Sequence, residues 1–152
     1  MKGKYTASTV AKWFLYYNSE YEAEYGDDRI SNLKLQKLLY YAQGCYLALK
    51  GRPLFDENIL HWQHGPVVRE IYDEYKINGS NPIDYCGNYH YGEINQEDEA
   101  ILINVYDVFG KYTAGALRNM THEEDPWKQT TSNQVISLES IRRYFEDNYI
   151  EG

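Results

Sequence analysis

The stretch from Ser31 to Gly51 constrains the fold most, because it predicts one long, well-bounded helix. Its apolar residues follow each other in steps of three and four, at Leu35, Leu38, Leu39, Ala42, Cys45, Tyr46 and Leu49. This spacing places them on one stripe of an α-helix. Ser31 can cap the first turn, and Gly51 followed by Pro53 is typical of a helix end. We therefore expect this stretch to be the central core helix.

The remaining chain predicts further helices and little extended structure. Apolar spacing and capping residues favour helices near residues 8–21, 66–78, 95–112, 113–120 and 137–149, a single turn at 125–126 and a solvated acidic turn at 22–29. Pro66 suits the first position of its helix. Residues 58–63 can form a strand, in a hairpin or beside Val135 and Ile136. The predicted fold class is mainly α: a single domain, residues 1–152, of five to six helices with at most a small two-stranded β element.

Charge and hydropathy narrow the environment and the partners. The net charge is −8, which opposes non-specific binding to a phosphate backbone. No apolar segment is long enough to cross a membrane, and the start of the chain lacks the apolar run of a signal peptide. We expect a cytoplasmic protein with no membrane partner and no further domain at either end. Seventeen tyrosines suit either half-buried core positions or a protein interface.

Catalytic and metal-binding motifs are not found in the sequence. It contains no nucleophile elbow, no glycine-rich phosphate loop and no paired-histidine metalloprotease motif. His61 and His64 are three residues apart, but the Gly65-Pro66 pair that follows argues against a metal-binding helix. The acidic run at residues 123–125 precedes a proline and is typical of a helix cap. We therefore expect no enzyme activity, no cofactor and no metal.

Two junctions between predicted elements each combine a tryptophan, a histidine and a proline. They are Trp62–Val67, with His64 and Pro66, and Thr121–Trp127, with His122. Such residues either plug the ends of helices or lie together as a recognition surface. Gly44 is costly inside a helix, which indicates that another backbone passes close to it. We expect at least one junction to pack against the central helix.

The residues of the central helix and the two junctions also resemble a known family. Leu33–Gly44, reading LKLQKLLYYAQG, is similar to the signature helix of the Panacea domain, the SocA-like antitoxin family, which includes phage-associated proteins of the GepA type. Residues 53–55, the junction motif from Trp62 to Val67, Thr121-His122 and Pro126-Trp127 then follow in the family's order. The resemblance runs from about Tyr5 to Tyr149. It implies a mainly helical antitoxin that neutralises a toxin from an adjacent gene by direct protein contact, on a phage or mobile element.

The resemblance supplies candidate residues for partner binding or for a structural signature. They are Lys34, Lys37, Tyr40, Tyr41, Gln43, Trp62, His64, Pro66, His122 and Trp127. We expect the first five to lie on the outer face of the central helix.

The sequence is compatible with a homo-oligomer. It is also compatible with two other functions. One is a helix-turn-helix regulator that binds nucleic acid through Lys34 and Lys37, with Arg142-Arg143 elsewhere, although the net charge makes nucleic acid an unfavourable partner. The other is a metal-dependent hydrolase that uses His64, His122 and Glu123 or Glu124.

Overall fold

The computed structural model describes residues 2–25 and 29–150, except for the side chains of residues 22–25. In this part of the chain the elements follow in the order α1 (Ala7–Tyr25), α2 (Asn32–Lys50), β1 (Leu60–Trp62), β2 (Gly65–Val67), α3 (Arg69–Tyr75), the 3-10 helix η1 (Lys76–Asn78), α4 (Gln96–Phe109), α5 (Ala114–His122), α6 (Asp125–Lys128) and α7 (Leu138–Asn148). The predicted mainly α fold with one two-stranded sheet is confirmed. The acidic turn was wrong for residues 22–25, which continue α1, and residues 26–28 lie outside the described part.

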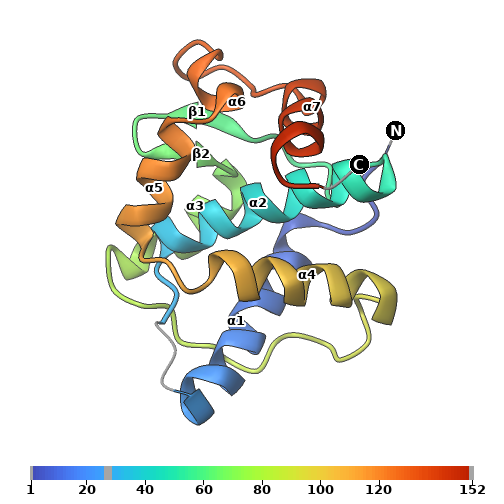
Figure 1. Ribbon diagram of the computed structural model, residues 1–152. Helices are drawn as coiled ribbons and strands as arrows, with labels where there is room; N and C mark the ends of the chain where they lie inside the picture. The colour runs from blue at the N-terminus through green and yellow to red at the C-terminus, as the bar shows by residue number, and fades with distance from the viewer. Residues whose placement is uncertain (1, 26–28, 151–152) are drawn as a thin grey trace.

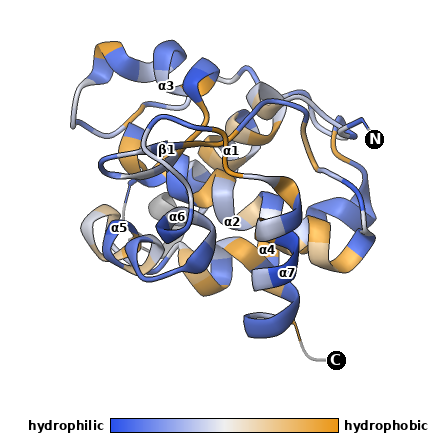
Figure 2. Ribbon diagram, turned by 90° about the horizontal axis from the view of Figure 1, so that it is seen from above, coloured by the Kyte–Doolittle hydropathy of each residue, from blue (hydrophilic) through white to orange (hydrophobic). Residues whose placement is uncertain are grey.

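Helix α2 lies at the centre, with α1 and α4 on one side and the hairpin, α6 and α7 on the other (Figure 1). Seen from above, the other elements surround it (Figure 2). Apart from Leu33, every residue from Asn32 to Leu47 is buried. Only the end of the predicted stripe was wrong, because Leu49 is 49% exposed in the last turn. A helix covered on all sides needs partners for its polar side chains as well as for its apolar ones.

Four of the predicted helix starts are capped by the expected residues. The side chains of Ser31, Asn95, Thr113 and Ser137 each accept a hydrogen bond from a backbone N–H in the first turn of α2, α4, α5 and α7. Gly51 ends α2 with φ of 72°, and its N–H donates to the Leu47 carbonyl. These caps depend on residues within one turn of each other, so the local sequence is enough to place them.

The β1–β2 hairpin corrects the expected role of Pro66. Pro66 lies in β2 opposite His61 and is not the first residue of a helix. The expected pairing with Val135 is also present, as an isolated bridge between Val135 and Leu60 on the other edge of β1. Backbone hydrogen bonds extend this contact, since the His61 N–H donates to the Gln134 carbonyl at 3.0 Å. Both proposed partners of the 58–63 strand therefore exist, because β1 is flanked on both sides.

The close approach predicted at Gly44 is made by a ring rather than by another backbone. A Cβ added to Gly44 would lie 2.4 Å from atoms of the Phe145 ring of α7. Phe145 is fully buried and packs at ring centroid distances of 5.4 Å from Tyr40 and 5.0 Å from Tyr149. Gly44 is therefore the position that lets α7 lie directly on α2.

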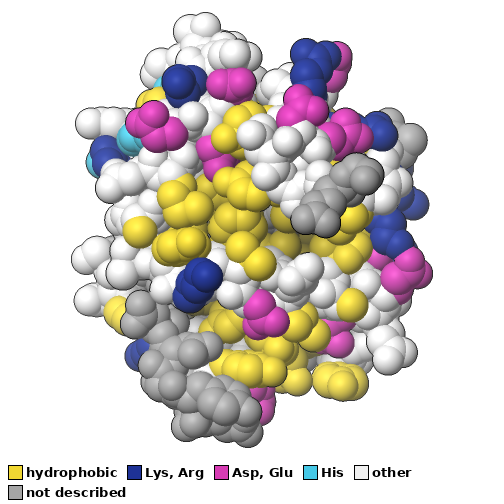
Figure 3. Space-filling model, viewed as in Figure 1, with side chains coloured by type: hydrophobic (Ala, Val, Ile, Leu, Met, Phe, Trp, Pro, Cys, Tyr) yellow, Lys and Arg dark blue, Asp and Glu magenta, His cyan; other side chains and the backbone are white. Residues whose placement is uncertain are grey.

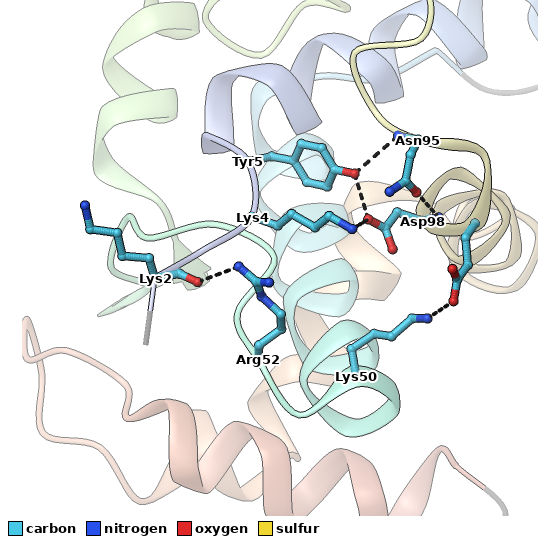
Figure 4. A network of polar contacts seen from close by, with 8 residues as sticks. Lys2, Lys4, Tyr5, Lys50, Arg52, Asn95 and Asp98 are labelled. Atoms are coloured by element: carbon cyan, nitrogen blue, oxygen red, sulfur yellow. Dashed lines mark hydrogen bonds and ion pairs between the residues drawn. The ribbon is translucent and has the colours of Figure 1, made fainter.

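The N-terminal segment is fastened to the start of α4 (Figure 4). The Tyr5 hydroxyl donates to Asp98 at 2.6 Å, and the Lys4 ammonium lies 2.9 Å from the same carboxylate. The Tyr5 N–H donates to the Leu54 carbonyl at 2.9 Å, next to a parallel bridge between Tyr5 and Phe55. Burial alone would raise the pKa of Asp98, but the hydrogen bonds from Tyr5 and Lys4 outweigh it and lower that pKa. The carboxylate therefore stabilises the folded chain in its charged form.

Candidate functional site

The polar residues of the α2 signature are buried, which corrects their expected place on an outer face. Lys34, Lys37, Tyr40, Tyr41 and Gln43 are each at most 2% exposed. Their side chains are therefore almost completely removed from solvent in this conformation. Of the two predicted roles, partner binding or a structural signature, these residues fit the structural one, because each side chain contacts a segment distant in sequence.

Two of these side chains hold neighbouring backbone. The Lys34 Nζ donates to the Gly110 carbonyl at 2.6 Å, at the end of α4. The Gln43 amide oxygen accepts from the Leu54 N–H at 2.7 Å, and its Nε2 donates to the Phe55 carbonyl at 2.9 Å. A buried backbone group without a partner would cost a few kcal/mol, so these bonds fix where the loops run.

Lys37 joins α2 to the hairpin. Its Nζ donates to the Pro66 carbonyl at 2.9 Å. Burial, with the nearby Arg118 guanidinium, lowers the pKa of Lys37 to about 7. Gly65, with φ of 108°, makes this contact possible, because a Cβ there would lie 2.8 Å from the Lys37 Cε and 2.8 Å from the Thr121 Oγ1. The Gly-Pro step of the motif therefore shapes the backbone around this lysine.

Tyr40 and Tyr41 converge on a buried carboxylate that joins three helices. Their hydroxyls donate to Glu124 at 2.8 and 3.0 Å, and the Tyr149 hydroxyl at the end of α7 donates to it as well. Glu124 is 3% exposed, and burial raises its pKa although the three hydroxyls act in the opposite direction. Through these hydrogen bonds Glu124, at the start of α6, joins α2 to the end of α7. The sequence pattern offered Glu124 as part of a helix cap or as a hydrolase candidate, and no pattern linked it to Tyr149.

The two junctions meet, as one of the sequence hypotheses required. The Trp127 ring stacks on His61 and on His122, each at a centroid distance of 4.1 Å. The Trp127 indole N–H donates to the Trp62 carbonyl at 2.9 Å. Both junctions also contact α2, through Lys37 at Pro66 and through the two tyrosines at Glu124. The prediction that a junction packs against the central helix is therefore confirmed for both.

A groove opens between the β1–β2 turn, the start of α2 and the α3–η1 segment. Its volume is about 720 Å³. It is lined by Ser31, Asn32, Leu33, Gln36, Lys37, Trp62, Gln63, His64, Gly65, Val67, Tyr72, Lys76, Gly79, Ser80, Ala114, Ser132 and Asn133. Three of the candidate residues, Lys37, Trp62 and His64, thus line a concave surface, while Pro66, His122 and Trp127 lie outside this lining. A hollow of this size with mixed aromatic and polar walls is typical of a binding site.

A second surface is apolar. Figure 3 shows hydrophobic side chains gathered over α4 and toward α7. On and just after α4, Val108 is 45% exposed and Tyr112 is 36% exposed. Contiguous apolar surface of this kind is a second place where a protein partner could bind.

Among the residues that the structure describes, the arrangements that the two alternative functions need are not formed. Lys34 and Lys37 are buried, so the basic helix face of a nucleic-acid regulator is missing, and Arg142 and Arg143 are engaged by Glu146 and Glu139. Within residues 2–25 and 29–150, no group of three or more His, Cys, Asp or Glu side chains could hold a metal ion. His64 instead accepts a hydrogen bond from Arg118 at 3.1 Å.

Comparison with known proteins identifies the family. Residues 35–128, well over half of the chain, match the family described as "Antitoxin SocA-like, Panacea domain". The chain belongs to this antitoxin family. The matched range begins in α2 and ends at the close of α6, so it contains the α2 signature from Leu35 onward, the hairpin and both junctions.

A curated relative agrees with this membership. The protein named Antitoxin SocA from Caulobacter vibrioides (strain NA1000 / CB15N) is 49% identical over 53 residues. The aligned stretch covers 35% of this chain and 28% of that protein, so the chain matches well under half of the relative's length. No solved structure matches the chain. None of the helices in the described residues is long and apolar enough to span a membrane.

Proposed function

We propose that this SocA-like chain is an antitoxin that neutralises the toxin of a neighbouring gene by binding it directly in the cytoplasm. The observation that carries the proposal is the family match over residues 35–128. The described residues add a rigid scaffold, because α2 is tied by buried hydrogen bonds to the hairpin, to α6 and to α7. A pre-organised surface loses little entropy on binding, which suits a stoichiometric inhibitor.

The whole chain, residues 1–152, acts as one domain in this proposal. Helices α1 and α7 lie outside the family match, yet Phe145 of α7 packs against Gly44 of α2, and Asn18 of α1 donates to the Tyr106 hydroxyl of α4 at 3.0 Å. Removing either helix would therefore expose the core. We also place the gene on a phage or mobile element, which sequencing of its surroundings tests.

Co-expression tests the central proposal. The neighbouring reading frame is induced alone and together with this chain, and growth is recorded. We expect arrest with the neighbour alone, rescue with both, and co-purification of the two proteins from the rescued cells. Arrest that this chain does not relieve would contradict the proposal.

A titration separates binding from catalysis. A fixed amount of purified toxin is mixed with increasing amounts of this chain, and residual toxin activity is measured. A non-catalytic inhibitor removes activity in proportion to its amount and stops at a fixed ratio. Full inactivation by a small fraction of an equivalent would show that the chain is an enzyme instead.

A further inference from the structure

We propose that the groove between the β1–β2 turn and η1 is the toxin-binding site, and that it holds an acidic segment of the toxin. This assignment rests on the proposed antitoxin function, since the toxin is its ligand. It replaces the outer face of α2, which the structure buries, as the surface of recognition.

The charge of the groove differs from that of the rest of the molecule. The chain carries a net charge of −8, but none of the described residues that line the groove is Asp or Glu. Lys76 contributes positive charge to the groove wall, and it lies 3.6 Å from Asp73, which also pairs with Arg69, so the two cations outnumber the one carboxylate. Lys37 is also part of the lining but is 1% exposed, and its ammonium is bound to the Pro66 carbonyl, so it adds no exposed charge. The first turn of the 19-residue helix α2 adds the positive end of its dipole. An acidic ligand is therefore favoured here and disfavoured elsewhere on this surface.

The lining without carboxylates continues beyond the groove. A second hollow of about 400 Å³ shares Ser31 and Ala114 with it and is otherwise lined by Arg29, Lys34, Pro82 and Thr113. Arg29 is engaged there by Asp84, which lies outside the hollow's lining. The two hollows together follow the start of α2. A continuous surface of this kind suits a segment of polypeptide better than a single small ion.

The walls combine aromatic area with fixed polar groups. The Trp62 and Tyr72 rings meet edge to face at a centroid distance of 5.1 Å. Gln36 accepts from the Val68 N–H at 2.8 Å, and the Asn32 amide donates to the Tyr72 carbonyl at 3.1 Å, so α2 holds the α3 side of the groove in place. Tryptophan, tyrosine and pre-formed walls are the features that contribute most to protein–protein affinity.

A protein rather than a nucleic acid fits this site. The lining without carboxylates is confined to one face of an acidic chain, and a long phosphate backbone would run past it onto repelling surface. A short acidic segment of a folded partner can place its carboxylates beside Lys76 without extending beyond the groove. An acidic segment as the ligand can be tested with substitutions that make the groove more negative or more positive.

Gln63 offers a clean probe, because its side chain is exposed on the turn between β1 and β2 and lines the groove. The purified product of the neighbouring reading frame is immobilised, and its affinity for wild-type chain, Gln63→Glu and Gln63→Lys is measured by biolayer interferometry. Matched controls are Gln129→Glu and Gln129→Lys, since Gln129 is exposed at the end of α6 and outside the groove lining. Circular dichroism checks that all variants fold.

We expect Gln63→Glu to weaken binding about tenfold and Gln63→Lys to leave it unchanged or tighter, with both Gln129 variants within twofold of wild type. A structural disturbance would shift both Gln63 variants in the same direction. Raising the salt concentration from 0.1 to 0.5 M should weaken the wild type more than Gln63→Glu, because salt screens the attraction.

Other results overturn the proposal in distinguishable ways. Wild-type affinity for both Gln63 variants, together with loss in Val108→Glu, would assign the toxin to the apolar α4 surface and leave the antitoxin function standing. Tighter binding by Gln63→Glu would exclude an acidic segment. A gel shift of a 20-nucleotide poly(U) RNA that Gln63→Glu abolishes would assign the groove to nucleic acid. No binding of the neighbour's product by the wild type would remove both the groove assignment and the proposed function.

Discussion

Gly44→Ala tests the contact on which the placement of α7 depends. Alanine in place of a helical glycine gains about 1 kcal/mol of intrinsic helix stability. The new Cβ, however, would lie 2.4–2.5 Å from three atoms of the Phe145 ring. Overpacking in a dense core costs about 1–3 kcal/mol, and Phe145 is enclosed by Tyr40, Tyr41 and Tyr149, so the upper end applies. We therefore expect a net loss of about 2 kcal/mol.

A double-mutant cycle shows whether the Phe145 ring is the cause. In a Phe145→Leu background the ring atoms are gone, so Gly44→Ala should become neutral or stabilising by up to about 1 kcal/mol. The coupling energy is then about 2–3 kcal/mol. Gly115→Ala in α5 is the matched control, because no atom lies within 4 Å of its added Cβ, and it should not destabilise.

Urea unfolding followed by circular dichroism measures these free energies. For a domain of this size, a loss of about 2 kcal/mol corresponds to a decrease in Tm of roughly 4–8 °C. The reasoning is refuted if Gly44→Ala is as stable as the wild type, or if the same loss persists in the Phe145→Leu background.

Three further substitutions test other contacts of the scaffold. The pKa of Lys37 is lowered from 10.5 to about 7 in the folded chain, so unfolding takes up a proton at pH values between these two. The stability of the wild type should therefore rise from pH 7 to pH 9 relative to that of Lys37→Met, by at most about 1.4 kcal/mol per pH unit. Urea titrations at both pH values measure this difference. Because the pKa of Asp98 is lowered in the folded chain, its contribution to the free energy of unfolding is present at neutral pH and is lost as the pH falls through the folded-state pKa. Asp98→Asn should therefore lose about 2 kcal/mol of stability at pH 7 and progressively less in acid, and Tm values measured across this pH range check the trend. Gly65→Ala should lose about 3 kcal/mol in urea unfolding, from its φ of 108° and the clash with Lys37 and Thr121, whereas Gly79→Ala, with φ of 57° and open space, should lose less.

Features set by neighbouring residues were predictable from the sequence, and features set by distant ones were not. The caps at Ser31 and Gly51 depend on a single turn, so pattern and propensity agree with the structure. Pro66 satisfies the local rule for a helix start, but its pairing with His61 across the hairpin overrides that rule. The wrong assignment of Pro66 therefore came from a contact that no local pattern contains.

The buried polar residues of α2 show the same limit more strongly. Helical periodicity separates an apolar stripe from a polar face, and it assigned Lys34, Lys37 and Gln43 to solvent. In the structure these side chains satisfy the backbone of segments that lie 11 to 76 residues away in sequence. The family resemblance indicates that such residues recur, but their role in holding the scaffold together is seen only in the fold. The groove could not be predicted at all, because residues from Ser31 to Asn133 line it.

Hydrogen–deuterium exchange of the chain, with and without the purified product of the neighbouring gene, tests the central claim most directly. If this SocA-like chain binds its toxin through the groove, exchange should slow in residues 60–67, 72–80 and 131–134, while α4 stays unchanged. Protection confined to α4, or no protection anywhere at saturating toxin, would contradict the account.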